Sequence, residues 1–192
     1  MEILLETRRL RLRRFTAEDG GRLFDLDADP RVMRFITGGP GTARAELEND
    51  ILPAFLDYYR RPGGYGFWAA ERLGTSDFLG WFHLRPDQGA PPDEPELGYR
   101  LRHGAWGQGL ATEGATALID RAFAELDVQR VTASTMAVNA ASRRVMEKAG
   151  MRFVRHFIAD WPVAIPGDEH GDVEYALTRH QWEDDRGVPG DT

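Results

Sequence analysis

Apolar and polar positions alternate near the start of the chain, where Leu10 and Leu12 alternate with Arg9, Arg11, Arg13 and Arg14. Alternation with a period of two is typical of a strand, so the arginine-rich face is expected to lie in water. A threonine and an aspartate at 16–19, followed by an apolar run, predict a short capped helix. Helical spacing over 42–56 predicts a second helix, which Pro53 would strain or interrupt.

The rest of the chain alternates between strand and helix patterns. Two strand-like segments joined by a Gly-Thr-Ser turn predict an antiparallel hairpin. A later helical pattern has one apolar face, made of Ala111, Ala115, Leu118, Ile119, Ala122, Phe123 and Leu126. The expected strands are 65–72, 78–85, 96–101, 130–138, 151–160 and 172–178, and the expected helices are 111–126 and 140–149.

This order of elements predicts an α/β or α+β fold, in which helices cover both faces of a mixed sheet. With 192 residues, the chain is expected to form a single domain. We expect that domain over residues 1–180 and a polar, flexible C-terminal tail over 181–192.

Charge and composition argue against several classes of function. The chain has 24 basic and 31 acidic side chains, and its net charge of −7 repels a nucleic-acid backbone. The arginines of 8–14 could form a nucleic-acid arm, but a solvated strand face fits the acidity better. No apolar run is long enough to span a membrane, and the start of the chain lacks an apolar signal core. We therefore expect a cytoplasmic protein with neither nucleic-acid nor membrane partners.

A glycine-rich segment joins a predicted strand to a predicted helix, with Gly104, Gly107 and Gly109 within six residues. Such a turn lets several backbone N–H groups converge, and the helix N-terminus adds about half a positive charge. The segment therefore predicts a diphosphate site, and a simple reversal of the chain is the alternative. Two nucleotide motifs fail, because the dinucleotide fingerprint needs glycine where Thr112 stands and the P-loop needs a lysine.

The segment 138–151 is a second junction between a strand and a helix. Asn139 stands at the expected N-cap and Ser142 near the third helical position, so helix capping is one explanation of this pattern. Arg144 and Lys148 are among the cations that follow, and they could meet a long polyanionic cofactor leaving the glycine-rich loop. An acidic protein that binds such a cofactor needs a local basic lining of this kind.

Together these two segments resemble the GNAT superfamily of acetyl-coenzyme A dependent N-acetyltransferases, particularly its RimJ/RimL-like branch. The resemblance rests on ELGYRL at 96–101, AWGQGLATE at 105–113, and NAAS and EKAGM within 139–151. Other parts of the chain, at 7–13 and 29–35, are similar to the same branch. The resemblance implies a single GNAT domain with a twisted, mostly antiparallel sheet.

The resemblance also implies that acetyl-coenzyme A is the acyl donor and that no metal takes part. The strand at Tyr99 and Leu101 would pair through its backbone with the pantetheine arm, and the loop amides would hold the pyrophosphate. Trp106 stands where the general family pattern has Arg or Gln. A tryptophan at this position is usual in the RimJ/RimL-like branch. The cofactor-binding residues implied are Tyr99, Arg100, Leu101, Trp106, Gly107, Gln108, Gly109, Leu110, Ala111, Thr112, Asn139, Ser142 and Arg144.

Acyl transfer to an amine needs a proton acceptor, because amines with pKa values of ~8 to ~10 are mostly protonated at pH 7. Glu96, at the start of the strand beside the cofactor, is the candidate base, and a structural carboxylate that pairs with Arg100 is the alternative. His83 is the second candidate. By resemblance, Ser142 would hydrogen-bond the departing thiolate, because Met146 replaces a tyrosine that many family members use as general acid.

The chain has no cysteine, so the acetyl group cannot rest on a cysteine sulfur, and we expect direct attack in a ternary complex. The acceptor would be a protein N-terminus or a small amine. An acidic, aromatic loop at 160–172 could attract it, or could be a solvated hairpin tip. By resemblance, residues 29–59 shape the acceptor side. The alternative to an enzyme is a non-catalytic acyl-coenzyme A sensor or scaffold. The predicted edge strands are compatible with a homodimer.

Overall fold

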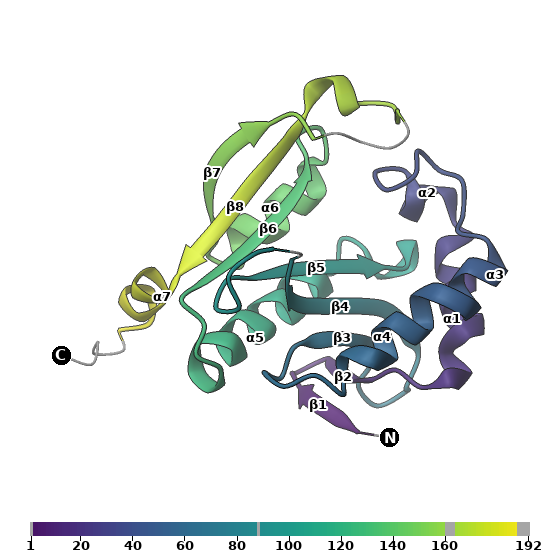
Figure 1. The fold of residues 1–192 in the computed structure, drawn as a ribbon, viewed down its shortest axis with the longest axis horizontal. Coiled ribbons are helices and arrows are strands. Elements are labelled where there is room, and N and C mark those ends of the chain that lie inside the picture. The colour runs from purple at the N-terminus through teal and green to yellow at the C-terminus, as the bar shows by residue number, and fades with distance from the viewer. Residues whose placement is uncertain (1, 88, 160–163, 188–192) are drawn as a thin grey trace.

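One eight-stranded sheet organises the part of the chain that the computed structural model describes, residues 2–87, 89–159 and 164–187 (Figure 1). Its strand order is β1-β2-β3-β4-β5-β6-β8-β7. Neighbouring strands are antiparallel except β5 and β6, which are parallel. The strands are β1 (Ile3–Glu6), β2 (Leu10–Arg14), β3 (Gly66–Arg72), β4 (Phe78–Pro86), β5 (Pro95–Leu101), β6 (Arg130–Met136), β7 (Arg152–Phe157) and β8 (Asp172–Thr178).

Helices cover both faces of this sheet (Figure 1). A π-helical turn at Leu47–Ile51 precedes Pro53, which has no N–H to continue the regular hydrogen-bond ladder. None of the helices in the described ranges is long and apolar enough to cross a membrane. The helices are α1 (Gly20–Asp27), α2 (Pro30–Met33), α3 (Arg44–Glu46), α4 (Leu52–Tyr58), α5 (Leu110–Glu125), α6 (Ala140–Lys148) and α7 (Arg179–Arg186).

Two apolar clusters lie on the two faces of the sheet, because successive side chains of a strand point to opposite faces. On β3, Trp68 and Ala70 pack in the cluster under α5, whereas Phe67 and Ala69 pack in the cluster under α1 and α4. The predicted mixed sheet with helices on both faces is thereby confirmed. The apolar face expected for α5 is also confirmed, with the following side chains buried: Ala115, Leu118, Ile119, Ala122 and Phe123.

The structure differs from the sequence-based expectations at both ends of the chain. β1 is a strand that the sequence did not predict, and it pairs with β2 at the edge of the sheet. The expected tail begins instead as α7, because Thr178 caps this helix and Trp182 is buried with its indole N–H donating to Asp120 at 2.8 Å. Residues 188–192 of the expected tail and 160–163 of the expected acceptor loop lie outside the described residues.

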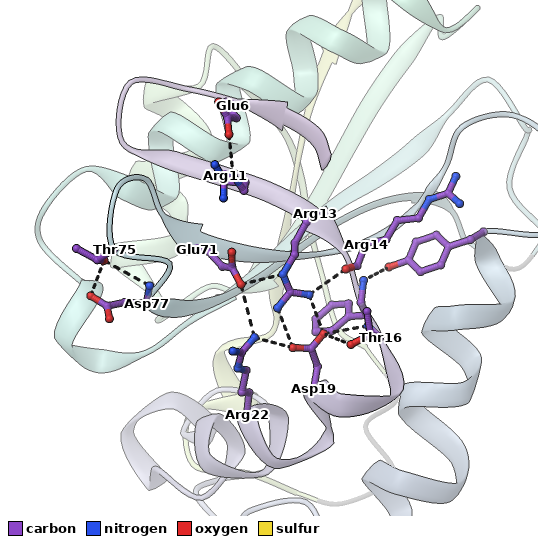
Figure 2. A network of polar contacts seen from close by, with 12 residues as sticks. Glu6, Arg11, Arg13, Arg14, Thr16, Asp19, Arg22, Glu71, Thr75 and Asp77 are labelled. Carbon is purple, nitrogen blue, oxygen red and sulfur yellow. Dashed lines mark hydrogen bonds and ion pairs between the residues drawn. The ribbon is translucent and has the colours of Figure 1, made fainter. Parts of the chain in front are cut away.

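A buried ion-pair network joins α1 to the sheet (Figure 2). The Arg13 guanidinium donates to both carboxylate oxygens of Asp19, at 2.7 and 2.8 Å, and to Glu71 at 2.8 Å. All three side chains are 2% exposed. Arg22 also donates to Asp19, at 2.9 Å. Arg13 therefore does not lie on the solvated face that the alternation predicted, because α1 covers that position of β2.

The same network makes stability depend on pH. Burial alone would raise the pKa of Asp19, but the hydrogen bonds from Arg13 and the Thr16 backbone, together with the Arg22 charge, lower it. A carboxyl with a lowered pKa stabilises the fold at pH values above its unfolded pKa of about 3.9. This contribution is lost as the pH falls through the pKa of the folded state, so the network favours folding at neutral pH.

Arg13→Met should lower the free energy of unfolding at pH 7 by about 3–5 kcal/mol, because Asp19 and Glu71 then remain buried without a counter-charge. Urea unfolding measures the difference. Arg11→Met is the matched control on β2, because Arg11 pairs with Glu6 at the surface and its loss should cost less than about 1 kcal/mol. Similar losses in the two variants would show that the buried network contributes no more than a surface pair.

Candidate active site

The parallel strands β5 and β6 separate soon after they meet. Within the described residues, Glu96 and Thr132 are their single partner pair. Just after the end of β5, on the edge that faces β4, the N–H of Arg102 donates to the carbonyl oxygen of Leu79. Because amides alternate in direction along a strand, those of Tyr99 and Leu101 point toward the side of β6, where the two strands no longer pair. This edge of β5 therefore offers main-chain groups without a neighbouring strand.

The loop between β5 and α5 presents a row of unused amide groups. The N–H of Trp106 donates within the preceding turn and that of Glu113 donates to Gly109, but the amides of 107–112 make no hydrogen bond with the described residues. Gly107 and Gly109 have φ values of +70° and +76°, which favour glycine. Residues 106–109 are exposed, and the N-terminus of α5 adds partial positive charge. The expected cradle is thus open and suits an anion.

The turn between β1 and β2 holds this loop in place. The Glu113 carboxylate accepts hydrogen bonds from Thr7 Oγ1 at 2.6 Å and from the Arg9 backbone and Nε at 2.8 and 2.6 Å. Arg9 Nη1 also donates to the Gln108 carbonyl at 2.8 Å, and the Trp106 indole donates to the end of β5. Burial alone would raise the pKa of Glu113, but these hydrogen bonds lower it and keep the carboxylate ionised.

Asn139 begins α6 as a helix cap. Its Oδ1 accepts from the backbone N–H of Ser142 at 3.2 Å, and its Nδ2 donates to Thr135 Oγ1 at 3.1 Å. The capping explanation of this asparagine is therefore realised in the structure. Arg144 is exposed on the same helix and has no ion-pair partner among the residues that the structure describes.

Tyr99 connects β5 to α6. Its hydroxyl lies 2.9 Å from Ser142 Oγ and 3.1 Å from the Ser142 carbonyl oxygen. Burial raises the pKa of Tyr99 to about 12, so the phenol remains protonated at neutral pH. The structure thus brings together the hydroxyls of Tyr99 and Ser142, two residues that the sequence analysis proposed for separate roles. Met146, which occupies the place of the family's usual tyrosine, is 2% exposed and belongs to the apolar core.

Glu96 and Arg100 lie on one face of β5 but do not pair with each other. Arg100 donates to Asp27 of α1 at 2.6 Å, and the cation beside Glu96 is Arg85, at 3.9 Å. Burial raises the pKa of Glu96, although the Arg85 charge opposes this shift. A carboxylate whose pKa moves toward neutrality suits general-base chemistry. The side chain of Arg100 is held on the α1 face, outside the group around the glycine-rich loop.

His83 of β4 lies opposite Gly98 of β5 and is buried. A Cβ atom on Gly98 would lie 2.0 Å from His83 Nε2, so the close approach of this ring requires glycine. Burial lowers the pKa of His83 to about 3, which keeps the imidazole neutral at physiological pH. Because it holds a proton so weakly, His83 fits the role of base less well than Glu96 does.

A cavity of about 340 Å³ lies beside these residues, between the sheet and the helical segments from α1 to α4. On the sheet side it is lined by alternate residues of β4, namely Trp81, His83 and Arg85. Sequence reasoning missed this cavity and its link to Asp27, although the period of two could have placed the three β4 residues on one face. Among the described residues, no group of His, Asp and Glu side chains could hold a metal ion.

Comparison with known families identifies the class of this protein. A family model described as an acetyltransferase (GNAT) domain matches residues 9–152. The chain therefore belongs to the GNAT acetyltransferase family. Its sheet and flanking helices form the fold of that family, as in the GNAT acetyltransferase of Bacillus anthracis, with a TM-score of 0.75 and 23% identity over 94% of this chain and 99% of that one.

Curated relatives extend this assignment. The chain is 33% identical over 185 residues to FsC-acetyl coenzyme A-N(2)-transacetylase of Aspergillus fumigatus, covering 93% of this chain and 77% of that protein. It is also 33% identical to the uncharacterised YkkB of Bacillus subtilis, over 84% and 92% of the two chains. RimL, a ribosomal L7/L12 alpha-N-protein acetyltransferase solved with coenzyme A, shares the fold, with a TM-score of 0.77 and 17% identity over 92% and 98%. The chain is thus an acetyl-coenzyme A dependent acetyltransferase.

Proposed function

We propose that this protein transfers the acetyl group of acetyl-coenzyme A to a primary amine, as an N-acetyltransferase of the RimJ/RimL-like branch. One observation carries the proposal: the amides of 107–112 have no hydrogen-bond partner among the described residues, and the loop residues 107–109 are exposed at the start of α5, in a geometry that suits a diphosphate. The names of relatives such as the N-acetyltransferase YoaA of Bacillus subtilis support an amine acceptor. The strings at 96–101 and 105–113 support the branch.

The residues present fit a long polyanionic donor. The amides of 107–112 would hold the diphosphate, and the unpaired edge of β5 at Tyr99 and Leu101 would accompany the pantetheine arm. Asn139 and the exposed cation of Arg144 lie on the neighbouring α6. Main-chain donors are needed because the net charge of the protein, −7, repels anions. When bound, acetyl-coenzyme A supplies an acetyl group activated as a thioester.

Glu96 would remove the proton from the acceptor amine, directly or through a water molecule. Burial raises the pKa of Glu96, so its carboxylate is a stronger base than that of an exposed glutamate toward a proton that an ordinary amine holds with a pKa of ~8 to ~10. Because the chain has no cysteine, we infer that the neutral amine attacks the acetyl carbon directly in a ternary complex.

Ser142 would supply the hydrogen bond to the departing sulfur, and Tyr99 would position it. When the Tyr99 phenol donates to Ser142 Oγ, the serine proton is free to point away from the phenol, toward the leaving group. When the phenol donates to the Ser142 carbonyl instead, the serine hydroxyl is the donor to Tyr99. The tyrosine would thereby control the direction of the serine proton from β5, whereas position 146, where many family members have a tyrosine, lies on α6.

Gly107→Ala should weaken coenzyme A binding about tenfold, because a left-handed φ costs a non-glycine residue roughly 1–2 kcal/mol and shifts the loop amides. The added Cβ meets no atom within 4 Å, so the effect comes from the backbone. Calorimetry should show unchanged affinity for S-acetylpantetheine, which lacks the diphosphate. Gly104→Ala is the control, with open space and no left-handed φ. Equal weakening for both ligands would argue against the diphosphate site.

Glu96→Gln should lower kcat/KM for amine acetylation by about 10²–10⁴-fold and leave coenzyme A affinity unchanged. The base works ionised, so wild-type activity should fall as the pH drops through a pKa above the usual ~4.3 of glutamate, and the variant should lack this acid limb. Thiol release with a panel of amines is the measurement. Glu48→Gln, at an exposed glutamate, is the control. A wild-type protein that binds acetyl-coenzyme A but acetylates no amine would instead be an acyl-coenzyme A sensor.

Ser142→Ala should lower kcat about 10- to 100-fold with little change in KM for acetyl-coenzyme A, because a hydrogen bond to a charged group contributes about 1.5–3 kcal/mol. Tyr99→Phe should have a smaller effect of the same kind. Since Tyr99 acts through Ser142, the double variant should be no slower than Ser142→Ala alone. Steady-state kinetics measure both parameters, and fully additive losses would contradict a positioning role for Tyr99.

A further inference from the structure

The cavity beside β4 and β5 is too large to be a packing defect. Its volume is about 340 Å³, whereas protein interiors hold few voids larger than a water molecule and ligand pockets begin at roughly 300 Å³. Helical segments form one wall and strands β3 to β5 the other. Apolar side chains dominate, among them Met33, Ile36, Leu47, Ile51, Phe55 and Trp81.

Three aromatic rings give the cavity a planar, apolar lining. Phe55 stacks on Phe67 with ring centres 3.9 Å apart, and Trp81 meets both rings edge-on at 5.6 and 6.0 Å. Such surfaces favour an aromatic ring or an alkyl group over a hydrated polar one. Ile36 lines the same cavity and is 36% exposed, so the apolar wall continues to the protein surface.

Three of the charged groups that line the cavity, Asp27, Arg85 and Arg100, have ion-pair partners, and the fourth, Glu46, is exposed. Asp27 is 1% exposed and accepts from Arg100 at 2.6 Å and from Thr42 at 2.7 Å, so both of its oxygens are occupied. Glu46 also lines the cavity, but it is exposed and has no ion-pair partner in the described part of the chain. A ligand in the cavity therefore meets apolar walls beside charges that already have partners, with the carboxylate of Glu46 on the exposed side.

Glu96 stands directly beside this cavity. It is the cross-strand partner of Arg85, a lining residue, with 3.9 Å between Glu96 Oε2 and Arg85 Nη2. The period of two places Glu96 on the same face of β5 as Arg100, which also lines the cavity. An amine held at Glu96 would therefore direct the rest of its molecule into the cavity.

We propose that the acetyl acceptor is a primary amine attached to an apolar body, an aromatic ring or a branched alkyl chain, that fills this cavity. The inference rests on the proposed N-acetyltransferase function and names the acceptor class. Small apolar amines and peptides with an apolar first residue share this chemistry, and the test below separates the two sources.

A homologous series of amines tests the apolar body. Ethylamine, butylamine, hexylamine and phenethylamine are compared by kcat/KM in the thiol-release assay, with ethanolamine and ethylenediamine as polar probes. Burying a methylene should raise kcat/KM roughly fourfold until the cavity is full. The expected order is phenethylamine and hexylamine above butylamine, and butylamine above ethylamine and the polar probes. A flat series, or a preference for the polar probes, would overturn the proposal.

Filling the cavity provides an independent test. Ile51→Trp should lower kcat/KM for phenethylamine at least tenfold and leave ethylamine turnover unchanged, because only the larger body competes for the filled volume. Leu56→Trp is the matched control, since Leu56 packs on the same apolar cluster without lining the cavity. Should Ile51→Trp not fold, Ile36→Trp at the exposed edge replaces it, with the exposed Ile3→Trp as its control. An equal loss for both amines in the cavity variants would overturn the proposal.

Peptides complete the panel. A peptide that begins with phenylalanine is compared with one that begins with serine, each alongside phenethylamine. If only phenethylamine is acetylated, the acceptor is a small amine. If the phenylalanine peptide is acetylated faster than the serine peptide, the acceptor is the N-terminal residue of a peptide. Both results support an apolar acceptor. Faster acetylation of the serine peptide overturns this inference and leaves the proposed function standing. No thiol release with any amine, while coenzyme A still binds, overturns the proposed function itself.

Discussion

The candidate site depends on the separation of β5 from β6 after one shared pair of residues. If β5 and β6 remained paired, the amides of Tyr99 and Leu101 would hydrogen-bond to β6, and no room would remain for a ligand arm between the two strands. The separation is possible because α5 connects the strands over a long crossover and because β8 pairs with β6 along its full length, from Arg130 to Met136. The sheet thus keeps its continuity through β8 while β5 keeps a free edge.

Charge is used mainly to hold elements together in this acidic protein. Arg13 forms ion pairs with Asp19 and Glu71, and Arg100 forms one with Asp27. Arg9 pairs with Glu113 at the start of α5, next to the glycine-rich loop. The first of these pairings positions α1, and α1 carries the aspartate that holds Arg100 at the cavity. Because these guanidinium groups already have partners, the amides of the glycine-rich loop are left as the principal donors for an anion.

Local patterns predicted the parts of the molecule that depend on neighbouring residues. The hairpin of β3 and β4, the buried face of α5 and the glycine-rich turn before α5 follow from spacing and turn chemistry alone. The contact of Tyr99 with Ser142 joins residues 43 positions apart, and that of Arg100 with Asp27 joins residues 73 apart, so no short pattern records either. Arg13 was misplaced for a related reason, because alternation separates two faces of a strand but cannot tell whether a helix covers the second one.

In the proposed mechanism, β5 carries most of the chemistry, because its two faces and its free edge serve different purposes. One face of β5 turns Glu96 toward the cavity, the other turns Tyr99 toward Ser142, and the edge between them offers main-chain amides. In the proposed mechanism, a buried methionine at 146 is compatible with catalysis because Ser142 of α6 supplies the hydroxyl and Tyr99 of β5 contacts it. Glu96 and Tyr99, which contacts the proposed thiolate partner Ser142, therefore lie on opposite faces of β5, and the proposal places the reacting acetyl group along the edge between them.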